Sequence, residues 1–189
     1  MTTGVLALQG DFREHRETLE QIGATVVEVR QAKHLAQVDR LIIPGGESTT
    51  IGRLLVLYDL IGPIRERAAQ GMPLWGTCAG AILMAKTIAD GKPDQPALAL
   101  MDITARRNAF GRQIESFEAD LHIDQLGEAP LHAVFIRAPL LEQPSQTVDI
   151  LSALENGRIV AAQQGNLLAT SFHPELTRDD RFHRYFLEL

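Results

Sequence analysis

Cysteine is almost absent from this chain, with one among 189 residues. A single cysteine cannot form an intramolecular disulfide, so a disulfide-stapled fold is excluded. A lone thiol is typical of a reducing compartment, and we expect a cytoplasmic protein. Zinc sites usually need several cysteines or clustered histidines. The histidines here are scattered, so we expect no metal site.

Long apolar runs and net positive charge are also missing. The first apolar run, residues 5–8, is far too short for a secretory signal, and no stretch approaches the roughly 18 apolar residues of a membrane span. The formal charge is −6, and phosphate binding needs a basic face. We therefore expect no membrane and no nucleic acid among the partners.

The composition is that of a globular protein, with 45% hydrophobic and 22% charged residues, and its length predicts one domain over residues 1–189. In the first half, short apolar runs alternate with helical patterns. This alternation indicates an α/β fold with a mostly parallel sheet covered on both faces. The strands predicted in the first half are residues 5–8, 25–29, 40–43 and 73–77.

Helices are expected between these strands. Asp11 has the position of an N-cap, with Glu14 completing a capping box, and Gly23 ends the first helix. A second helical stretch follows the third strand and breaks near residues 62–63. A third helix is predicted over residues 79–88.

Strands dominate the second half of the chain. Asn-Gly at residues 156–157 is a strong hairpin signal and Gly-Asn at 165–166 a weaker one, so we expect antiparallel strands added to the sheet. The chain ends on a predicted amphipathic helix with aromatic residues on one face. The strands predicted in this half are residues 97–103, 112–121, 133–136, 150–154, 158–164 and 167–172.

Cys78 stands in the run Gly76-Thr77-Cys78-Ala79-Gly80, after a predicted strand and before a predicted helix. This is the form of a nucleophile elbow, in which small neighbours let the backbone hold the nucleophile in a strained turn. The N-terminus of the next helix offers free N–H groups and a positive dipole end, which favour a thiolate. The alternative is a buried core cysteine, as most lone cysteines are.

His173-Pro174-Glu175 follows the last predicted strand. Pro174 favours an extended conformation at His173, and residues two apart in an extended segment project to the same side. Glu175 would then hold the His173 imidazole in one tautomer, as the acid of a catalytic triad does. The alternative is a surface histidine followed by a helix-capping acid.

Pro44-Gly45-Gly46-Glu47-Ser48 ends the third strand. Ligands bind beyond the carboxyl ends of strands in open α/β sheets. Paired glycines let backbone N–H groups approach a substrate oxygen, as in an oxyanion hole. The alternative is a plain strand-to-helix turn with Ser48 as the N-cap.

These three motifs, in this order and spacing, resemble those of the class I (triad) glutamine amidotransferases. Further segments are similar to the glutaminase subunits of pyridoxal 5′-phosphate synthase, and that resemblance spans nearly the whole chain. Its most specific segment is Arg-Asn-Ala-Phe-Gly-Arg-Gln at residues 107–113. The other matching segments are residues 8–11, 44–51, 135–139 and 172–176.

The resemblance implies a flavodoxin-like fold of three layers and a role for each motif residue. Cys78 would be the nucleophile that takes the side-chain amide of L-glutamine through a γ-glutamyl thioester, with His173 and Glu175 completing the triad. Backbone N–H groups of Gly46 and Ala79 would form the oxyanion hole, and no metal or cofactor would be needed. The residues implied to contact glutamine are Gly46, Glu47, Ser48, Arg107, Ile136 and Arg137.

The resemblance also implies a partner. The chain has three lysines and no glycine-rich phosphate loop, so it lacks the groups for building a pyridine ring from sugar phosphates. A ring-forming synthase (lyase) subunit would do this, in a large hetero-oligomer that receives the ammonia. The helix after Ser48 is a candidate contact surface. Two other functions stay open: a cysteine hydrolase such as a γ-glutamyl peptidase that acts alone, and a non-catalytic, chaperone-like relative.

Overall fold

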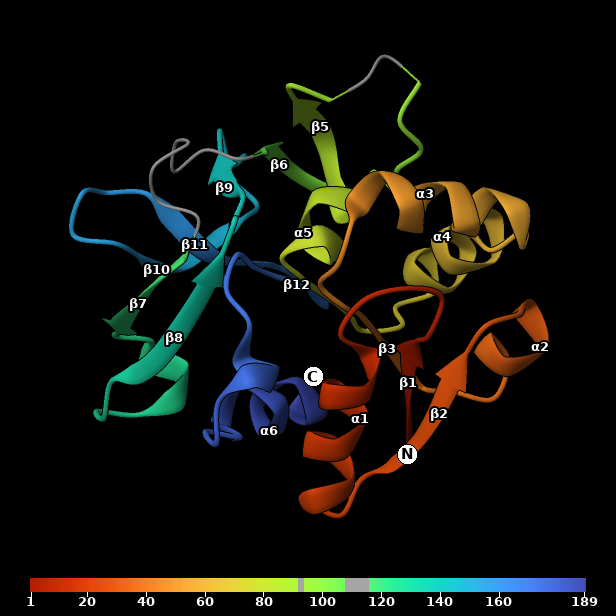
Figure 1. The fold of residues 1–189 in the computed structure, drawn as a ribbon, viewed down its shortest axis with the longest axis horizontal. Coiled ribbons are helices and arrows are strands. Elements are labelled where there is room, and N and C mark those ends of the chain that lie inside the picture. The colour runs from red at the N-terminus through yellow and green to blue at the C-terminus, as the bar shows by residue number, and fades with distance from the viewer. Residues whose placement is uncertain (92–93, 108–115) are drawn as a thin grey trace.

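The computed structural model describes residues 1–91, 94–107 and 116–189 (Figure 1). Most strands join one large sheet, and two form a separate pair. The strands of the sheet are β1 (Thr2–Leu6), β2 (Thr25–Val29), β3 (Arg40–Ile43), β4 (Leu74–Thr77), β5 (Ala85–Ala89), β6 (Met101–Arg106), β9 (Leu140–Glu142), β10 (Asp149–Ala153), β11 (Ile159–Gln164) and β12 (Leu167–Thr170). The separate pair is β7 (Ser116–Leu121) and β8 (Leu131–Ile136).

The helices lie on both faces of this sheet (Figure 1). They are α1 (Phe12–Gln21), α2 (Ala32–Leu35), α3 (Ser48–Leu57), α4 (Ile61–Ala69), α5 (Ala79–Met84) and α6 (Arg181–Glu188), with short 3₁₀ turns η1 (Asp124–Leu126) and η2 (Pro174–Leu176). No helix among the described residues is long and apolar enough to cross a membrane.

The sheet runs in the order β2-β1-β3-β4-β12-β11-β9-β6-β5, with β10 beside β11. The strands from β2 to β12 are parallel, whereas β11 is antiparallel to β12, β9 and β10. The expected parallel sheet with antiparallel additions from the second half is confirmed. The hairpins predicted at residues 156–157 and 165–166 are also confirmed, because they join β10 to β11 and β11 to β12.

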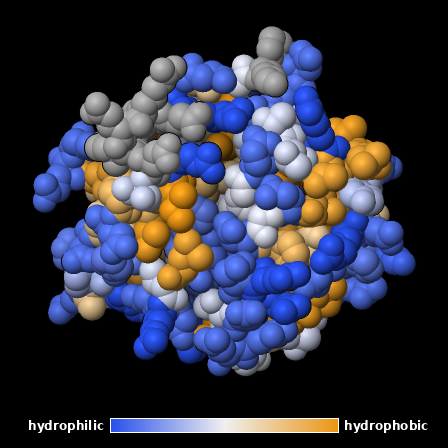
Figure 2. Space-filling model, in the orientation of Figure 1, coloured by the Kyte–Doolittle hydropathy of each residue, from blue (hydrophilic) through white to orange (hydrophobic). Residues whose placement is uncertain are grey.

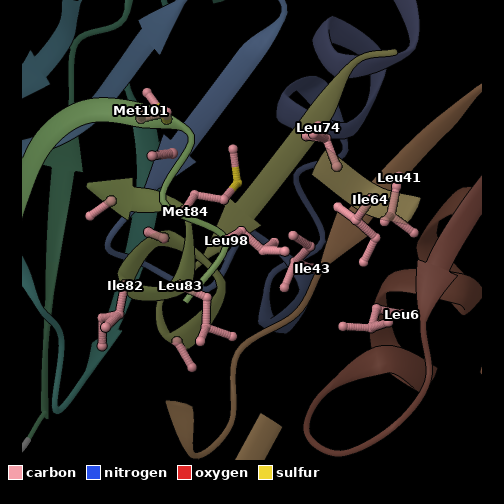
Figure 3. Close-up of a cluster of buried hydrophobic side chains, with 14 of the residues drawn as sticks. Leu6, Leu41, Ile43, Ile64, Leu74, Ile82, Leu83, Met84, Leu98 and Met101 are labelled. Carbon is pink, nitrogen blue, oxygen red and sulfur yellow. The ribbon is translucent and has the colours of Figure 1, made fainter. Parts of the chain in front are cut away.

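Alternate residues of the parallel strands enter two buried clusters, one on each face. On one face, Leu6 and Ile43 pack against α2 to α5, and Figure 3 shows Leu83 of α5 in this cluster. On the other face, Val5 and Ile42 pack against α1, α6 and the β7–β8 pair. Each fully buried side chain of this size stabilises the fold by about 1.5–3 kcal/mol. The result is a three-layer α/β fold with the carboxyl ends of β1, β3, β4 and β12 at one edge.

The helix predicted over residues 79–88 is wrong beyond Met84. At Ala85 the backbone becomes extended (φ −64°, ψ 140°), and β5 pairs in parallel with β6. This long-range pairing overrides the local helix propensity of Ala and Lys. The elements α2 and β9 were not predicted, because four and three residues are too short to show a periodic pattern.

Several strand boundaries also differ from the prediction. β1 covers Thr2–Leu6 rather than residues 5–8, and the strand predicted at 97–103 is found at Met101–Arg106. Backbone N–H groups of Leu98 and Leu100 instead bond to carbonyls of α5. Part of the strand predicted at 112–121 lies outside the described residues, and β7 begins at Ser116.

Asp11 is the N-cap of α1 as predicted, whereas Ser48, the N-cap in the alternative interpretation of the glycine loop, lies inside α3. The Asp11 side chain makes no capping hydrogen bond to α1, so the capping box is absent. Glu47 rather than Ser48 caps α3, because its carboxylate accepts hydrogen bonds from the first turn. The break between α3 and α4 precedes the predicted residues 62–63, and Pro63 lies in the first turn of α4, where proline is tolerated.

Candidate active site

Cys78 occupies a strained turn between β4 and α5, with φ +46° and ψ −101°. The neighbouring glycines make this turn possible. A Cβ on Gly80 would lie 2.0 Å from the carbonyl oxygen of Ile43, and one on Gly76 would lie 2.5 Å from the backbone of Gly80. These close approaches let α5 begin directly against β3 and β4. The strained turn predicted for a nucleophile elbow is present.

His173 and Glu175 lie side by side behind this turn. Nδ1 of His173 is 2.7 Å from Oε1 of Glu175, and both residues are buried. The backbone N–H of His173 donates to the carbonyl of Val134, which ties the residue to β8. The contact was predicted, but its reason was wrong: Pro174 begins the 3₁₀ turn η2, and this turn, not an extended strand, brings the two side chains together.

The protonation of His173 is controlled by its neighbours. Burial alone would lower the pKa of His173, but the neighbouring Cys78 and the hydrogen bond with Glu175 raise it to about 10. The imidazolium form is therefore favoured beside the sulfur, and a neighbouring imidazolium favours a nucleophilic thiolate. Burial in turn raises the pKa of Glu175, although its hydrogen bond with His173 opposes this.

The glycine loop after β3 is held by the segment that follows β1. The Gly45 carbonyl accepts from the Asp11 backbone N–H at 3.1 Å, and the Glu47 backbone N–H donates to Oε1 of Gln9 at 2.8 Å. Gly46 has φ +147°, a conformation that favours glycine. Ala79 is the first residue of α5, so its N–H has no acceptor within the helix. Gly46 and Ala79, the two residues predicted to form an oxyanion hole, line the same cavity.

A cavity of about 380 Å³ opens above Cys78. Nine of the ten residues singled out from the sequence line it, and the tenth, Glu175, lies behind His173. These nine are Gly46, Glu47, Ser48, Cys78, Ala79, Arg107, Ile136, Arg137 and His173. Sequence reasoning did not assign roles to four other lining residues. They are Gln9, Asp11, Ile82 and Leu176.

The first two of these had a usable signal. Gln9 and Asp11 follow β1 at its carboxyl end, the edge at which ligands bind in such sheets. Most of the specific motif at 107–113 gives no further information, because residues 108–113 lie outside the part of the chain that the structure describes.

The cavity carries opposite charges. Burial would raise the pKa of Glu47, but hydrogen bonds from Thr50 and Thr49 lower it to about 2, so its carboxylate is ionised. Arg107 lies 3.5 Å from this carboxylate. Arg137 follows β8 with a strained φ of +44°, and the Ile136 carbonyl lies 3.9 Å from the Cys78 sulfur. The arrangement suits a small zwitterion placed beside a thiol.

Asp11 is a second acidic residue beside His173. Its Oδ2 lies 3.5 Å from Nδ1 of His173, and the ligand-type atoms of Asp11, His173 and Glu175 lie within 4.8 Å of one another. Such a group has the spacing to hold a cation. However, Nδ1 of His173 is already hydrogen-bonded to Oε1 of Glu175, as the base and acid of a catalytic triad are.

Two buried histidines stand behind Glu175. His15 on α1 places Nε2 3.3 Å from Oε2 of Glu175, and its Nδ1 lies 2.9 Å from Nε2 of His183 on α6. The sequence analysis gave His15 no role, although it lies against the same carboxylate as His173. Residues 160 positions apart bring this contact about, so no local pattern could have shown it.

The fold and this site together define a class I glutamine amidotransferase. One crystal structure of a glutamine amidotransferase is 51% identical, with a TM-score of 0.93 over 98% of this chain and 97% of that chain. A glutamine amidotransferase from Thermotoga maritima shares the fold at 13% identity, with a TM-score of 0.64 over 99% of this chain and 80% of that chain.

The chain belongs to the SNO glutamine amidotransferase family, whose model matches residues 5–189. Two relatives have the name pyridoxal 5′-phosphate synthase subunit PdxT. The protein of Roseiflexus castenholzii is 65% identical over 100% of both chains. That of Herpetosiphon aurantiacus is 64% identical, also over 100% of both chains.

Proposed function

We propose that Cys78, His173 and Glu175 release ammonia from the side chain of L-glutamine. By its family and its relatives, the chain is the glutaminase subunit of pyridoxal 5′-phosphate synthase, which supplies ammonia for vitamin B6 synthesis. One observation supports the triad most: His173 is hydrogen-bonded to Glu175 through Nδ1 while its pKa is raised by the Cys78 sulfur. A structural cysteine needs no such neighbour.

The proposed reaction is acyl transfer through the Cys78 sulfur. The thiolate attacks the amide carbon of glutamine, and the N–H groups of Gly46 and Ala79 stabilise the oxyanion. The His173 imidazolium gives its proton to the departing ammonia, which leaves a γ-glutamyl thioester. His173 then takes a proton from water, and the hydroxide breaks the thioester to release glutamate.

Charge complementarity supports the glutamine-binding residues. An arginine suits the α-carboxylate, because guanidinium and carboxylate form paired hydrogen bonds. Arg107 and Arg137 both line the cavity, and Glu47 offers its ionised carboxylate to the α-ammonium group. Ser48 and Ile136 border the same space and would position the carbon chain.

The partner would dock beside the helix that leaves the glycine loop. Val56, Leu57 and Tyr58 at the end of α3 are exposed apolar residues, with Leu57 exposed by 72%. In Figure 2, apolar surface gathers on the side of the molecule where Figure 1 places α3 and α4. Contiguous exposed apolar residues are typical of protein–protein contacts. We assign this surface to the ring-forming synthase subunit of a large hetero-oligomer, into which the ammonia is channelled.

Ammonia release tests the proposed activity. The wild-type chain, mixed with the synthase subunit, should convert glutamine to glutamate and ammonia in equal amounts. Cys78→Ala should release none, while its circular dichroism spectrum and melting temperature stay close to those of the wild type. Undiminished release by Cys78→Ala would refute the proposal. Full activity of the isolated chain, with no response to the synthase, would favour a hydrolase that acts alone.

A further inference from the structure

We propose that His15 is a positioning residue for the reaction: its Nε2–H holds Oε2 of Glu175, so that Oε1 stays on His173. This rests on the proposed triad. Oε2 of Glu175 is buried and has no hydrogen-bond partner among the described residues. Nε2 of His15 lies 3.3 Å away and is 3.2 Å from the Thr77 hydroxyl oxygen. Only the contact with Thr77 has hydrogen-bond geometry, so Nε2–H acts on the carboxylate oxygen mainly electrostatically.

The hydrogen-bond partners determine which tautomer His15 adopts. If His15 donated through Nδ1 to His183, its Nε2 could accept from the Thr77 hydroxyl but would turn a lone pair toward the Glu175 carboxylate. Nδ1–H of His183 would then be a buried donor without an acceptor among the described residues. In the reverse arrangement, His183 donates through Nε2 to Nδ1 of His15. His15 then carries its proton on Nε2, toward Glu175. The second arrangement leaves one buried acceptor unpaired, which costs less than an orphaned donor beside a misdirected lone pair.

The surroundings keep both histidines neutral and rigid. Burial lowers the pKa of His15 well below its usual value, and the nearby His183 and His173 lower it further. Burial also lowers the pKa of His183 to about 4, although Asp180 opposes this. The Trp75 ring packs edge-on against both imidazoles, at 5.5 and 5.0 Å between centroids. His15 therefore acts as a fixed neutral donor and not as a second proton carrier.

These contacts form a chain that runs from α6 through α1 to the triad. His183 orients His15, His15 orients Glu175, and Glu175 orients His173. A carboxylate held at one oxygen alone can rotate about its last bond. Holding both oxygens fixes the imidazole of His173, and small displacements of a catalytic group cost large factors in rate. His15 touches no substrate, so its effect should fall on turnover rather than on binding.

The test compares His15 variants in complex with the synthase subunit. His15→Leu should lower kcat for glutamine hydrolysis about 10- to 100-fold and leave KM within about twofold. His15→Gln, whose amide can still donate toward Glu175, should recover most of kcat. In a Glu175→Gln background, His15→Leu should change kcat by less than about twofold, because the carboxylate that it positions is gone. Equal losses in both backgrounds would overturn the proposal.

A control separates positioning from stability. Phe182 is buried and stacks on Trp75, and the proposal does not use it for positioning Glu175, so Phe182→Leu should lower the melting temperature but not kcat. Alkylation of Cys78 by iodoacetamide needs neither glutamine nor a partner. The alkylation rate should fall in His15→Leu and stay at the wild-type value in Phe182→Leu. If His15→Leu lowers the melting temperature alone, His15 is structural. If the wild type releases no ammonia, the proposed function fails, and alkylation still decides the role of His15.

Discussion

Two residues at the site are held in left-handed backbone conformations that their side chains disfavour. Cys78 has φ +46° and Arg137 has φ +44°, and the carbonyl of Ile136 lies against the Cys78 sulfur. Each such conformation destabilises the folded state by roughly 1–3 kcal/mol, which the packing around it must offset. The strain places the sulfur and the guanidinium on the walls of one cavity. The strained turn at Cys78 was predicted from its local motif, whereas the strain at Arg137 was not.

The acid of the triad should matter less than the base. Glu175→Gln keeps a hydrogen-bonding group beside His173 but removes the charge, so turnover should fall by about 10²- to 10⁴-fold. Turnover should fall further in His173→Ala, which removes the proton carrier itself. Glu175 also helps to raise the pKa of His173, so the imidazolium should be lost at lower pH in Glu175→Gln. Steady-state kinetics across pH measure both effects. A Glu175→Gln enzyme with wild-type turnover would show that another group orients His173.

Acid should destabilise the fold through its buried histidines. The pKa of His183 is lowered to about 4, so between pH 6.5 and 4 the unfolded chain binds a proton that the folded chain does not. Stability is therefore retained above pH 6.5 and lost as the pH falls, by about 2 kcal/mol at pH 5. Urea unfolding at pH 7 and pH 5 should show a smaller loss in His183→Gln than in the wild type. His122→Gln, at an exposed histidine, should lose as much stability between pH 7 and pH 5 as the wild type does. If His183→Gln also loses as much as the wild type, the low pKa of His183 does not cause the effect.

At the scale of elements, the site depends on how closely separate loops approach. A Cβ on Gly10 would lie 1.8 Å from the Gly45 carbonyl oxygen, so the segment after β1 fits the glycine loop only without a side chain. The carbonyl of the Gly45–Gly46 peptide accepts a hydrogen bond from the Asp11 backbone N–H. The position of the Gly46 N–H therefore depends on two loops together.

Gly10→Ala should displace this loop. With the synthase subunit present, we expect kcat to fall by about 10²-fold or more, because the loss of one oxyanion donor lowers the rate by about that factor. Gly23→Ala is the matched control: Gly23 also has positive φ, +83° against +99° for Gly10, but nothing lies within 4 Å of its Cβ position. It should lose about 1 kcal/mol of stability and keep its kcat. A normal kcat in Gly10→Ala would mean that the loop has no part in catalysis.

The elements also show where sequence reasoning ends. Strands β2 and β3 were predicted with their observed bounds, because buried apolar runs flanked by turn residues are local signals. The pairing of β5 with β6, the η2 turn that joins His173 to Glu175, and the contact of His15 with Glu175 were not predicted. Each depends on segments far apart in the chain or on a backbone turn shorter than any periodic pattern.

At the scale of the whole molecule, the exposed apolar residues at the end of α3 form the surface that we assign to the synthase subunit. Leu57→Glu places a charge at the end of α3, so it should weaken the response to the synthase while the fold stays intact. Ile150→Glu is the control, because Ile150 is also exposed, by 53%, but lies on β10. Titrating the synthase subunit into each variant and measuring ammonia release tests this. A Leu57→Glu curve that matches the wild type would exclude α3 from the contact.

Covalent trapping tests the central claim, that Cys78 is the nucleophile toward glutamine, most directly. A diazoketone analogue of glutamine carries an electrophilic carbon at the position of the amide. In the complex with the synthase subunit, intact-protein mass spectrometry should show one added group per wild-type chain, and peptide mapping should place it on Cys78. Excess glutamine should slow the labelling, and Cys78→Ala should take up none. Labelling of Cys78→Ala at the wild-type rate, or of another residue in the wild type, would contradict the account.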